Sequence, residues 1–135
     1  AGKTLVENHA GLRCLECHQI GDRGKDFGPR LDGIGSRQTR EALLQSLLQP
    51  SLQIAPEFTA WTIETDEGDI YSGFILNETD KTIGVRDLVH GDIQIPSSAI
   101  QSRDRSTLSL MPQFLLQDLS PQQASDLLAY LKSLH

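Results

Sequence analysis

The chain has 135 residues, a length that suits one domain with a core large enough to fold without disulfide or metal support. Its formal net charge is −6, and its basic residues are scattered, so nucleic acid is not an expected partner. No apolar run approaches the roughly 20 residues that cross a bilayer, so no membrane span is expected. The acidic excess either steers a basic partner or keeps the protein soluble, and both readings stay open.

The amino-terminal residues, through Thr4–Ala10, predict a short helix that leads to a C-x-x-C-H sequence. Cys14 and Cys17 are the two cysteines of the chain, and His18 follows directly. In the C-x-x-C-H signature of haem attachment, two thiols reach the two vinyl groups at one edge of the porphyrin, and the histidine turns its imidazole under the iron. The spacing therefore predicts one covalent haem c, with His18 as the proximal iron ligand.

Other readings of the cysteine pair stay open beside this one. A thioredoxin-like redox pair would follow a strand in a βαβ unit, whereas here a helix is expected before the pair and a glycine-rich loop after it. A structural zinc site would need four ligands at matched spacings, and no further cysteine is present. A chance occurrence of the signature is the remaining alternative.

Glycine and proline mark the next segment, Gly21–Gly35, as a loop. A helix is expected over about Thr39–Gln49, where leucines form one apolar stripe and a proline follows. The carboxyl-terminal helix has the clearest signals of the chain. Ser120 is a good N-cap, Pro121 suits the first turn, and Gln123 completes a capping box.

The residues between these helices are rich in strand signals. Four runs of β-branched and aromatic residues, separated by turn-forming residues, predict short strands: Phe58–Thr65, Ile70–Leu76, Thr82–Leu88 and Ile93–Ile95. Their spacing of about ten residues suggests an antiparallel meander or small barrel, inserted over residues 59–107.

A second axial iron ligand would be a methionine, a histidine, or absent. Met111 is the only methionine, and it precedes Pro112 in a loop ahead of the last helix. A lone methionine is usually core filler, but in a haem protein Met111 becomes the best candidate. Its rivals are His9, which lies close to the attachment sequence, and His90 and His135, which both look solvated.

A ligating histidine normally gives its second ring N–H to a fixed acceptor. Pro29 follows His18 at a plausible distance, within Gly28-Pro29-Arg30-Leu31, and its carbonyl accepts hydrogen bonds while its nitrogen donates none. We therefore expect the Pro29 carbonyl to accept from His18. A simple loop turn is the alternative reading.

Together these motifs resemble a class I cytochrome c. The order is the attachment sequence, then Gly28-Pro29-x-Leu31, then Met111-Pro112 ahead of a leucine- and tyrosine-rich helix. The chain is more specifically similar to the haem-binding domains of Planctomycetes-type bacteria, often found at the end of large exported dehydrogenase-like proteins. The likeness covers nearly the whole chain, and the matching stretches are Gly28–Arg37, Pro50–Ser51, Ser109–Pro112 and Asp126–Leu131.

The resemblance implies a mostly α cytochrome c core, with three or more helices around one covalent haem, as a single domain over residues 1–135. The β-rich insert is the departure from a minimal class I cytochrome. The implied roles are thioether formation by Cys14 and Cys17, iron ligation by His18 and Met111, a hydrogen-bond acceptor at Pro29, and a crossing of the first and last helices at Gly2 and Tyr130.

Iron held by His18 and Met111 would have no open position for a substrate, so the expected function is single-electron transfer rather than catalysis. Redox partner proteins are expected, among them a dehydrogenase domain of a longer parent chain. The alternative is a gas- or peroxide-reactive haem sensor or enzyme in which Met111 dissociates. The insert would either dock a partner or shield a haem edge.

The resemblance also implies the periplasm or another exported side of a bacterial membrane. The sequence has no initiator methionine and no basic-then-apolar leader, which favours a processed chain or a piece of a longer one.

Overall fold

The structure is a computed structural model that describes all 135 residues, and the chain divides into two compact units. The first unit comprises Ala1–Leu52 and Pro112–His135, and the second comprises Gln53–Met111. The expected β-rich insert, residues 59–107, falls within the second unit.

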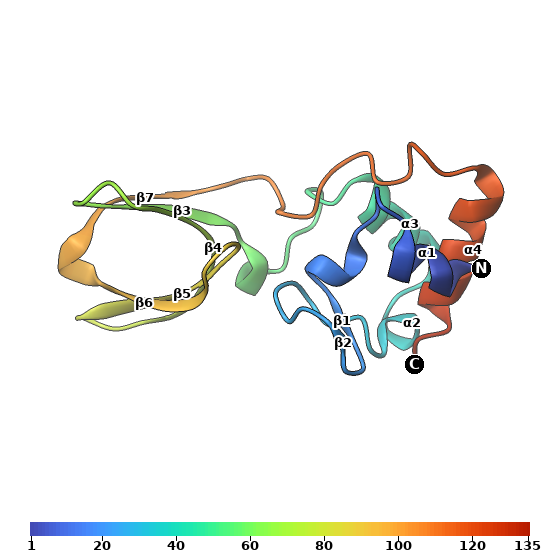
Figure 1. Cartoon of the computed structure of the whole chain (residues 1–135), viewed down its shortest axis with the longest axis horizontal. Helices are drawn as coiled ribbons and strands as arrows, with labels where there is room; N and C mark the ends of the chain where they lie inside the picture. The colour runs from blue at the N-terminus through green and yellow to red at the C-terminus, as the bar shows by residue number, and fades with distance from the viewer. The chain divides into compact units, whose positions relative to one another are not determined.

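The first unit is built from four helices and one short hairpin (Figure 1). The helices are α1 (Gly2–Asn8), α2 (Ile34–Arg37), α3 (Arg40–Leu48) and α4 (Pro121–Lys132), and the hairpin strands are β1 (Gln19–Ile20) and β2 (Arg23–Gly24). Helix α4 contacts the other three helices, and the apolar side chains buried on these elements include Val6, Leu43, Leu47, Leu127, Leu128 and Leu131. None of the helices is both long and apolar enough to cross a membrane.

Local capping explains where the two longest helices begin. The Thr39 hydroxyl accepts a hydrogen bond from the Ala42 N–H at 3.1 Å, at the start of α3. Ser120 and Gln123 form the predicted capping box, with bonds of 3.1 and 2.9 Å between each side chain and the other residue's backbone N–H. The predicted helices at both ends of the chain and over about Thr39–Gln49 are confirmed, whereas α2 and the hairpin were not expected in a glycine-rich segment.

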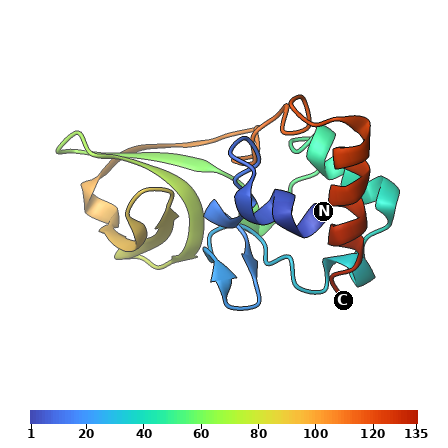
Figure 2. The ribbon, with the colours of Figure 1, turned by 45° about the vertical axis from the view of Figure 1, so that its right-hand side comes forward.

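The first and last helices cross at a glycine (Figure 2). A Cβ atom on Gly2 would lie 2.1 Å from the Asp126 carbonyl oxygen and 2.6 Å from the Tyr130 Cβ. The Asp126 backbone lies so close to Gly2 that no residue with a Cβ fits at position 2, because neither helix can move away without losing its packing. The crossing expected at Gly2 and Tyr130 is therefore confirmed.

The second unit is one antiparallel sheet of five strands, in the order β6-β5-β4-β3-β7 (Figure 1). The strands are β3 (Trp61–Thr65), β4 (Ile70–Glu78), β5 (Thr82–Asp87), β6 (Gly91–Pro96) and β7 (Ile100–Arg105). The four predicted strands form the meander from β3 to β6, and β7 returns to pair with β3. The sequence did not predict β7.

The sheet curls around its own apolar interior (Figure 1). Register shifts in the β3–β7 pair after Glu64 and in the β4–β5 pair after Ile75 mark irregularities where the strands bend. Alternate residues of the strands point inward and form one buried cluster, Ile63, Ile83, Val85 and Ile95, with Tyr71, Ile75, Ile93 and Ile100 packed against it.

The predicted fold class, a mostly α cytochrome c core, is wrong for this chain. About equal shares of the residues are helical and in strands, 30% and 27%. The reason is the length of the elements: α1 and α2 have seven and four residues, while the five-stranded sheet occupies most of the second unit. The chain is an α and β protein with its helices and its large sheet in separate units.

A buried carboxylate organises the turn between β5 and β6. Asp87 is 4% exposed, and its oxygens accept backbone hydrogen bonds from Ser72, Val89 and His90 at 2.8 to 2.9 Å. The His90 ring nitrogen Nδ1 also lies 2.8 Å from the Asp87 carboxylate. Burial alone would raise the pKa of Asp87, but these donors outweigh it and lower the pKa below its ordinary value.

We expect Asp87→Asn to destabilise the second unit by about 2–3 kcal/mol at pH 7, because the amide NH2 would face backbone donors in a buried site. Since the pKa of Asp87 is lower in the folded state, its ionic contribution is present above about pH 3.9 and is lost as the pH falls through the folded-state pKa. The difference in the free energy of unfolding between Asp87→Asn and wild type should therefore become smaller at acidic pH. Denaturant titration, monitored by the fluorescence of Trp61, measures the free energy of unfolding of the second unit, because Trp61 is the only tryptophan of the chain.

The matched control is Asp92→Asn. The Asp92 carboxylate pairs with the Arg86 guanidinium, but its side chain is 55% exposed, so its replacement should change stability little. Equal losses for the two variants would contradict a special role for Asp87.

Candidate haem-attachment site

The attachment sequence forms a tight turn that begins at Cys14 and ends at Cys17. Residues Cys14–Glu16 make one turn of 3-10 helix, and the backbone N–H groups of Cys17 and His18 donate to the Cys14 carbonyl at 3.2 and 2.9 Å. Side chains three residues apart in a 3-10 turn eclipse one another. Two thiols three residues apart can therefore meet two groups on one edge of a planar ligand.

The thiols are not primed for thiolate chemistry. Both cysteines are half-buried and neither is in a disulfide. Burial raises the pKa of Cys14, and the nearby Cys17 adds to the rise. Burial and the Glu16 carboxylate raise the pKa of Cys17, and Lys25 only partly opposes them. Redox-active C-x-x-C pairs have the opposite property, a lowered thiol pKa.

His18 has a fixed ring orientation. Its Nδ1 lies 2.6 Å from the Pro29 carbonyl oxygen, the contact that the sequence predicts. Since a carbonyl only accepts, the proton of the neutral imidazole resides on Nδ1 and the lone pair on Nε2. Nε2, the atom that a metal would take, has no hydrogen-bond partner. His18 is therefore held in the tautomer that a proximal ligand needs.

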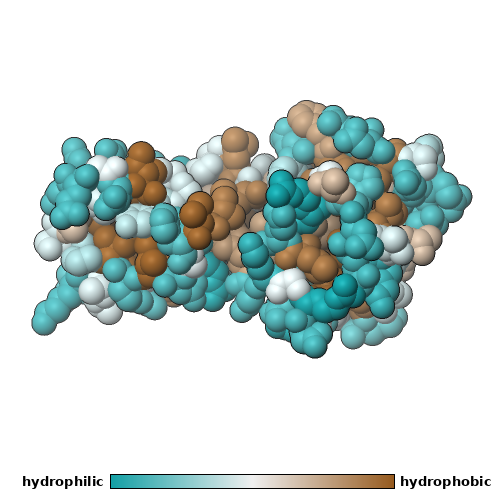
Figure 3. All heavy atoms as spheres, in the orientation of Figure 1, coloured by the Kyte–Doolittle hydropathy of each residue, from teal (hydrophilic) through white to brown (hydrophobic).

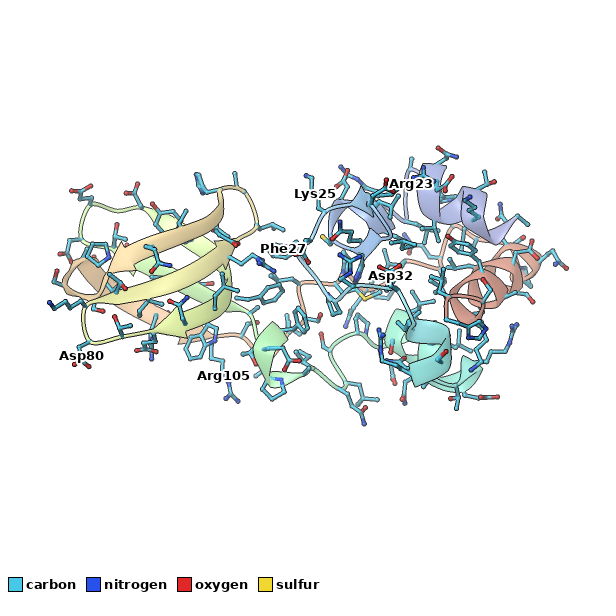
Figure 4. All side chains as sticks on the ribbon, turned by 90° about the horizontal axis from the view of Figure 1, so that it is seen from below. Arg23, Lys25, Phe27, Asp32, Asp80 and Arg105 are labelled. Carbon is cyan, nitrogen blue, oxygen red and sulfur yellow. The ribbon has the colours of Figure 1, made fainter.

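The loop after the β1–β2 hairpin wraps the attachment turn with backbone hydrogen bonds. The N–H of Gly28 donates to the Cys17 carbonyl at 2.6 Å, and the N–H of Lys25 donates to that of Leu15 at 3.0 Å. A Cβ on Gly28 would lie 3.3 Å from the His18 ring, tighter than ordinary contact. The loop thus sets the position of the Pro29 carbonyl against the ring; Figure 4 shows Lys25 and Phe27 on it.

A polar network, which the sequence analysis did not identify, closes this loop. The Asp32 carboxylate accepts from the Gly21 N–H at 2.9 Å and from the Arg30 guanidinium at 2.7 Å, and the Arg37 guanidinium donates to the Asp32 carbonyl at 2.7 Å. The Gly21 N–H and then Arg30 lower the pKa of Asp32. In the sequence, the only signal of this network is the presence of oppositely charged residues around Gly28-Pro29.

The predicted site residues belong to different units. Cys14, Cys17, His18 and Pro29 lie together in the first unit, whereas Met111 is the final residue of the second. Met111 is half-buried, and its backbone N–H donates to the Ser109 hydroxyl at 3.1 Å.

Each of the three rival histidines has its ring atom Nδ1 in a contact with another residue. His9 accepts there from the Gly11 N–H at 3.1 Å, His90 pairs with the buried carboxylate of the β5–β6 turn at 2.8 Å, and His135 contacts the Ser36 hydroxyl at 2.9 Å. His90 and His135 are exposed and His9 is half-buried.

The zinc reading fits the geometry poorly. No group of three or more histidine, cysteine, aspartate or glutamate side chains gathers where it could hold a metal ion, whereas structural zinc needs four such ligands. A covalent haem requires fewer groups from this unit than structural zinc does. It needs two thiols close together in a turn and one imidazole with a free Nε2. The residues present meet that requirement.

Comparison with known proteins adds no assignment: no family model matches the chain, and no curated protein matches it.

Proposed function

We propose that the chain is a monohaem c-type cytochrome module, related to class I cytochromes c, that transfers single electrons. The observation that supports this most is the contact of 2.6 Å between His18 Nδ1 and the Pro29 carbonyl. His18 directly follows Cys17 in the turn that begins at Cys14, and the contact prepares Nε2 for a metal. A redox disulfide does not require an imidazole held in this way, and a zinc site, which would, lacks the further ligands that structural zinc needs.

Each residue of the site has a separate task in this proposal. Cys14 and Cys17 add across the two vinyl groups and tether the haem, which when bound supplies one-electron chemistry at its iron. His18 ligates through Nε2. The Pro29 carbonyl keeps the proton on Nδ1, which fixes the ring plane and raises the basicity of Nε2. The hydrogen-bonded loop around Gly28 prevents the ring from turning away.

Met111 is the proposed distal ligand. Its thioether is the only one in the chain, and thioether ligation favours the reduced state and raises the potential. With both axial positions taken by protein, no substrate can reach the metal, so electron exchange is proposed rather than catalysis. The competing proposal, a gas- or peroxide-reactive site, requires Met111 to dissociate.

The proposed partners are redox proteins, including a dehydrogenase domain joined to this module in a longer parent chain. The proposed location is the periplasm or another exported side of a bacterial membrane. Both rest on the resemblance to the haem-binding domains of Planctomycetes-type bacteria and on the haem-attachment sequence at Cys14–His18.

The proposal is tested by visible absorption spectra of the purified, matured protein. We expect a low-spin spectrum in the oxidised and dithionite-reduced states, one haem per chain by pyridine haemochrome, and no rapid binding of carbon monoxide. Protein made without the haem-attachment machinery is the control and should be colourless. A colourless matured protein would contradict the proposal, and fast carbon monoxide binding would favour the gas-reactive alternative.

A further inference from the structure

Phe114 combines backbone strain with exposure. Its φ is +64°, and the only other non-glycine residue with positive φ is Arg13, at the start of the Cys14–Glu16 turn. For a bulky residue the left-handed region is unfavourable and rarely used. Burial stabilises the Phe114 side chain little, since the residue is 71% exposed. Among the exposed large hydrophobic residues, Phe114 is the only aromatic one.

The segment around Phe114 is ordered by local contacts. The Gln117 N–H donates to the Phe114 carbonyl at 3.2 Å, and the Leu119 N–H donates to the Leu116 carbonyl at 3.1 Å. Leu116 is half-buried, so the turn is anchored while the ring faces water. Strain held in an ordered segment points to a function for the strained residue, because a glycine there would be more stable.

The chain segment that contains Phe114 carries no charge. Residues 106–117 contain no acidic or basic side chain. The first unit has eight basic and eight acidic residues, while the second has four basic and ten acidic, so the whole net charge of −6 belongs to the second unit. A partner that docks on the first unit at Phe114 meets no charged side chain in this segment. Such a partner is therefore selected by apolar contact rather than by charge.

Phe114 is also close along the chain to the proposed distal ligand. The two are three positions apart, with two residues between them, and three fully extended steps of the chain span no more than about 11 Å. On the face drawn in Figure 3, hydrophobic residues form small patches separated by hydrophilic ones. A single protruding aromatic ring is a typical anchor for a small transient interface.

We propose that Phe114 is the docking contact for a redox protein with an uncharged, apolar face. This inference rests on the proposed electron-transfer function. The ring fills a shallow apolar site on the partner and brings the Met111 side of the haem within reach, and the electron then passes without any bond being made or broken. The left-handed backbone is the cost of presenting the ring outward.

The test uses holoprotein on gold electrodes with methyl-terminated monolayers, which stand in for an apolar, uncharged partner face. Phe114→Gly and Phe114→Asn both suit a left-handed backbone, so both should fold, with thermal unfolding midpoints equal to or above that of wild type. We expect each to lower the electron-exchange rate at the methyl surface about tenfold. The wild-type rate should change less than about twofold between low and high salt, since no charges are paired.

The matched control is Val89→Ala, which removes exposed apolar surface from a residue that is 81% exposed in the second unit. This variant should keep the wild-type rate. Unchanged rates in the Phe114 variants, or equal losses in the control, would overturn the docking role. A lowered unfolding midpoint, or a shifted haem spectrum or potential, would overturn it too, because Phe114 would then support the fold or the haem. Failure of the proposed function is distinguishable, since wild type itself would show no haem couple.

Discussion

Replacing Cys14 and Cys17 together by serine is expected to remove all covalently attached haem. The two are the only cysteines in the chain, and serine forms no thioether with a vinyl group. Each single variant should keep one bond, which shifts the pyridine haemochrome band toward that of a haem with one free vinyl. Haem staining after denaturing electrophoresis, together with acid–acetone extraction, measures the covalently attached fraction.

Glu16→Ala is the control, because it changes a residue inside the same motif. Its side chain is exposed and pairs with Arg13 at 2.8 Å, an interaction that contributes little, so haem attachment should be complete. Haem that stays bound after denaturation of the double variant would show that the thiols are not the attachment points. The haem-attachment reading of the C-x-x-C-H sequence would then fail.

Replacing Met111 by alanine is expected to lower the midpoint potential by on the order of 0.1 V or more, within the roughly 0.8 V range that axial ligands control. Loss of the thioether removes a ligand that favours the reduced state and leaves a position open. The ferric spectrum should become high-spin, and the reduced protein should bind carbon monoxide. Spectroelectrochemistry gives the potential, and carbon monoxide titration reports the open position.

Leu110→Ala and His90→Ala are controls for this experiment. Leu110 is the neighbouring half-buried residue, and the Nδ1 of His90 is held by the Asp87 carboxylate, so neither change should alter the spectrum. If Met111→Ala keeps a low-spin spectrum, another group is the ligand and His9→Ala becomes the next variant. If carbon monoxide already binds wild type as fast as the variant, the gas-reactive alternative is favoured.

Local sequence signals predicted the elements whose stability is also local. Ser120 and Gln123 form the capping box that their types and spacing require, and α4 begins there. The strands from β3 to β6 follow runs with alternating or β-branched residues. These predictions succeed because a helix cap or a strand pattern depends on residues that are close together in the chain.

Strand β7 shows where local signals fail. Five of its six residues are exposed, so the segment has none of the apolar alternation that marks a half-buried strand. Its pairing with β3 joins residues about 40 positions apart, Ile63 with Arg103 among them. Only the return of the chain to the other edge of the meander makes this segment a strand.

The incorrect fold class has a similar cause. The helical signals at both chain ends were clear, and the resemblance to class I cytochromes c implied a mostly α core around them. The helices are instead short, and their packing depends on close backbone approaches such as that of Gly2 to the Asp126 carbonyl. Such approaches follow from the crossing of two elements that are distant in sequence, so single-segment patterns do not reveal them.

The sequence alone determined the candidate chemistry, because the spacing of Cys14, Cys17 and His18 is by itself the C-x-x-C-H signature of haem attachment. It also singled out Met111 as the unique thioether and Pro29 as the expected acceptor. The tertiary structure decided the close approach of Gly2 to the last helix, the network that secures the His18 loop, and the exposure of Phe114. The first two depend on contacts between residues that are not neighbours in the chain, and the exposure depends on how the whole unit packs, so no local pattern encodes them.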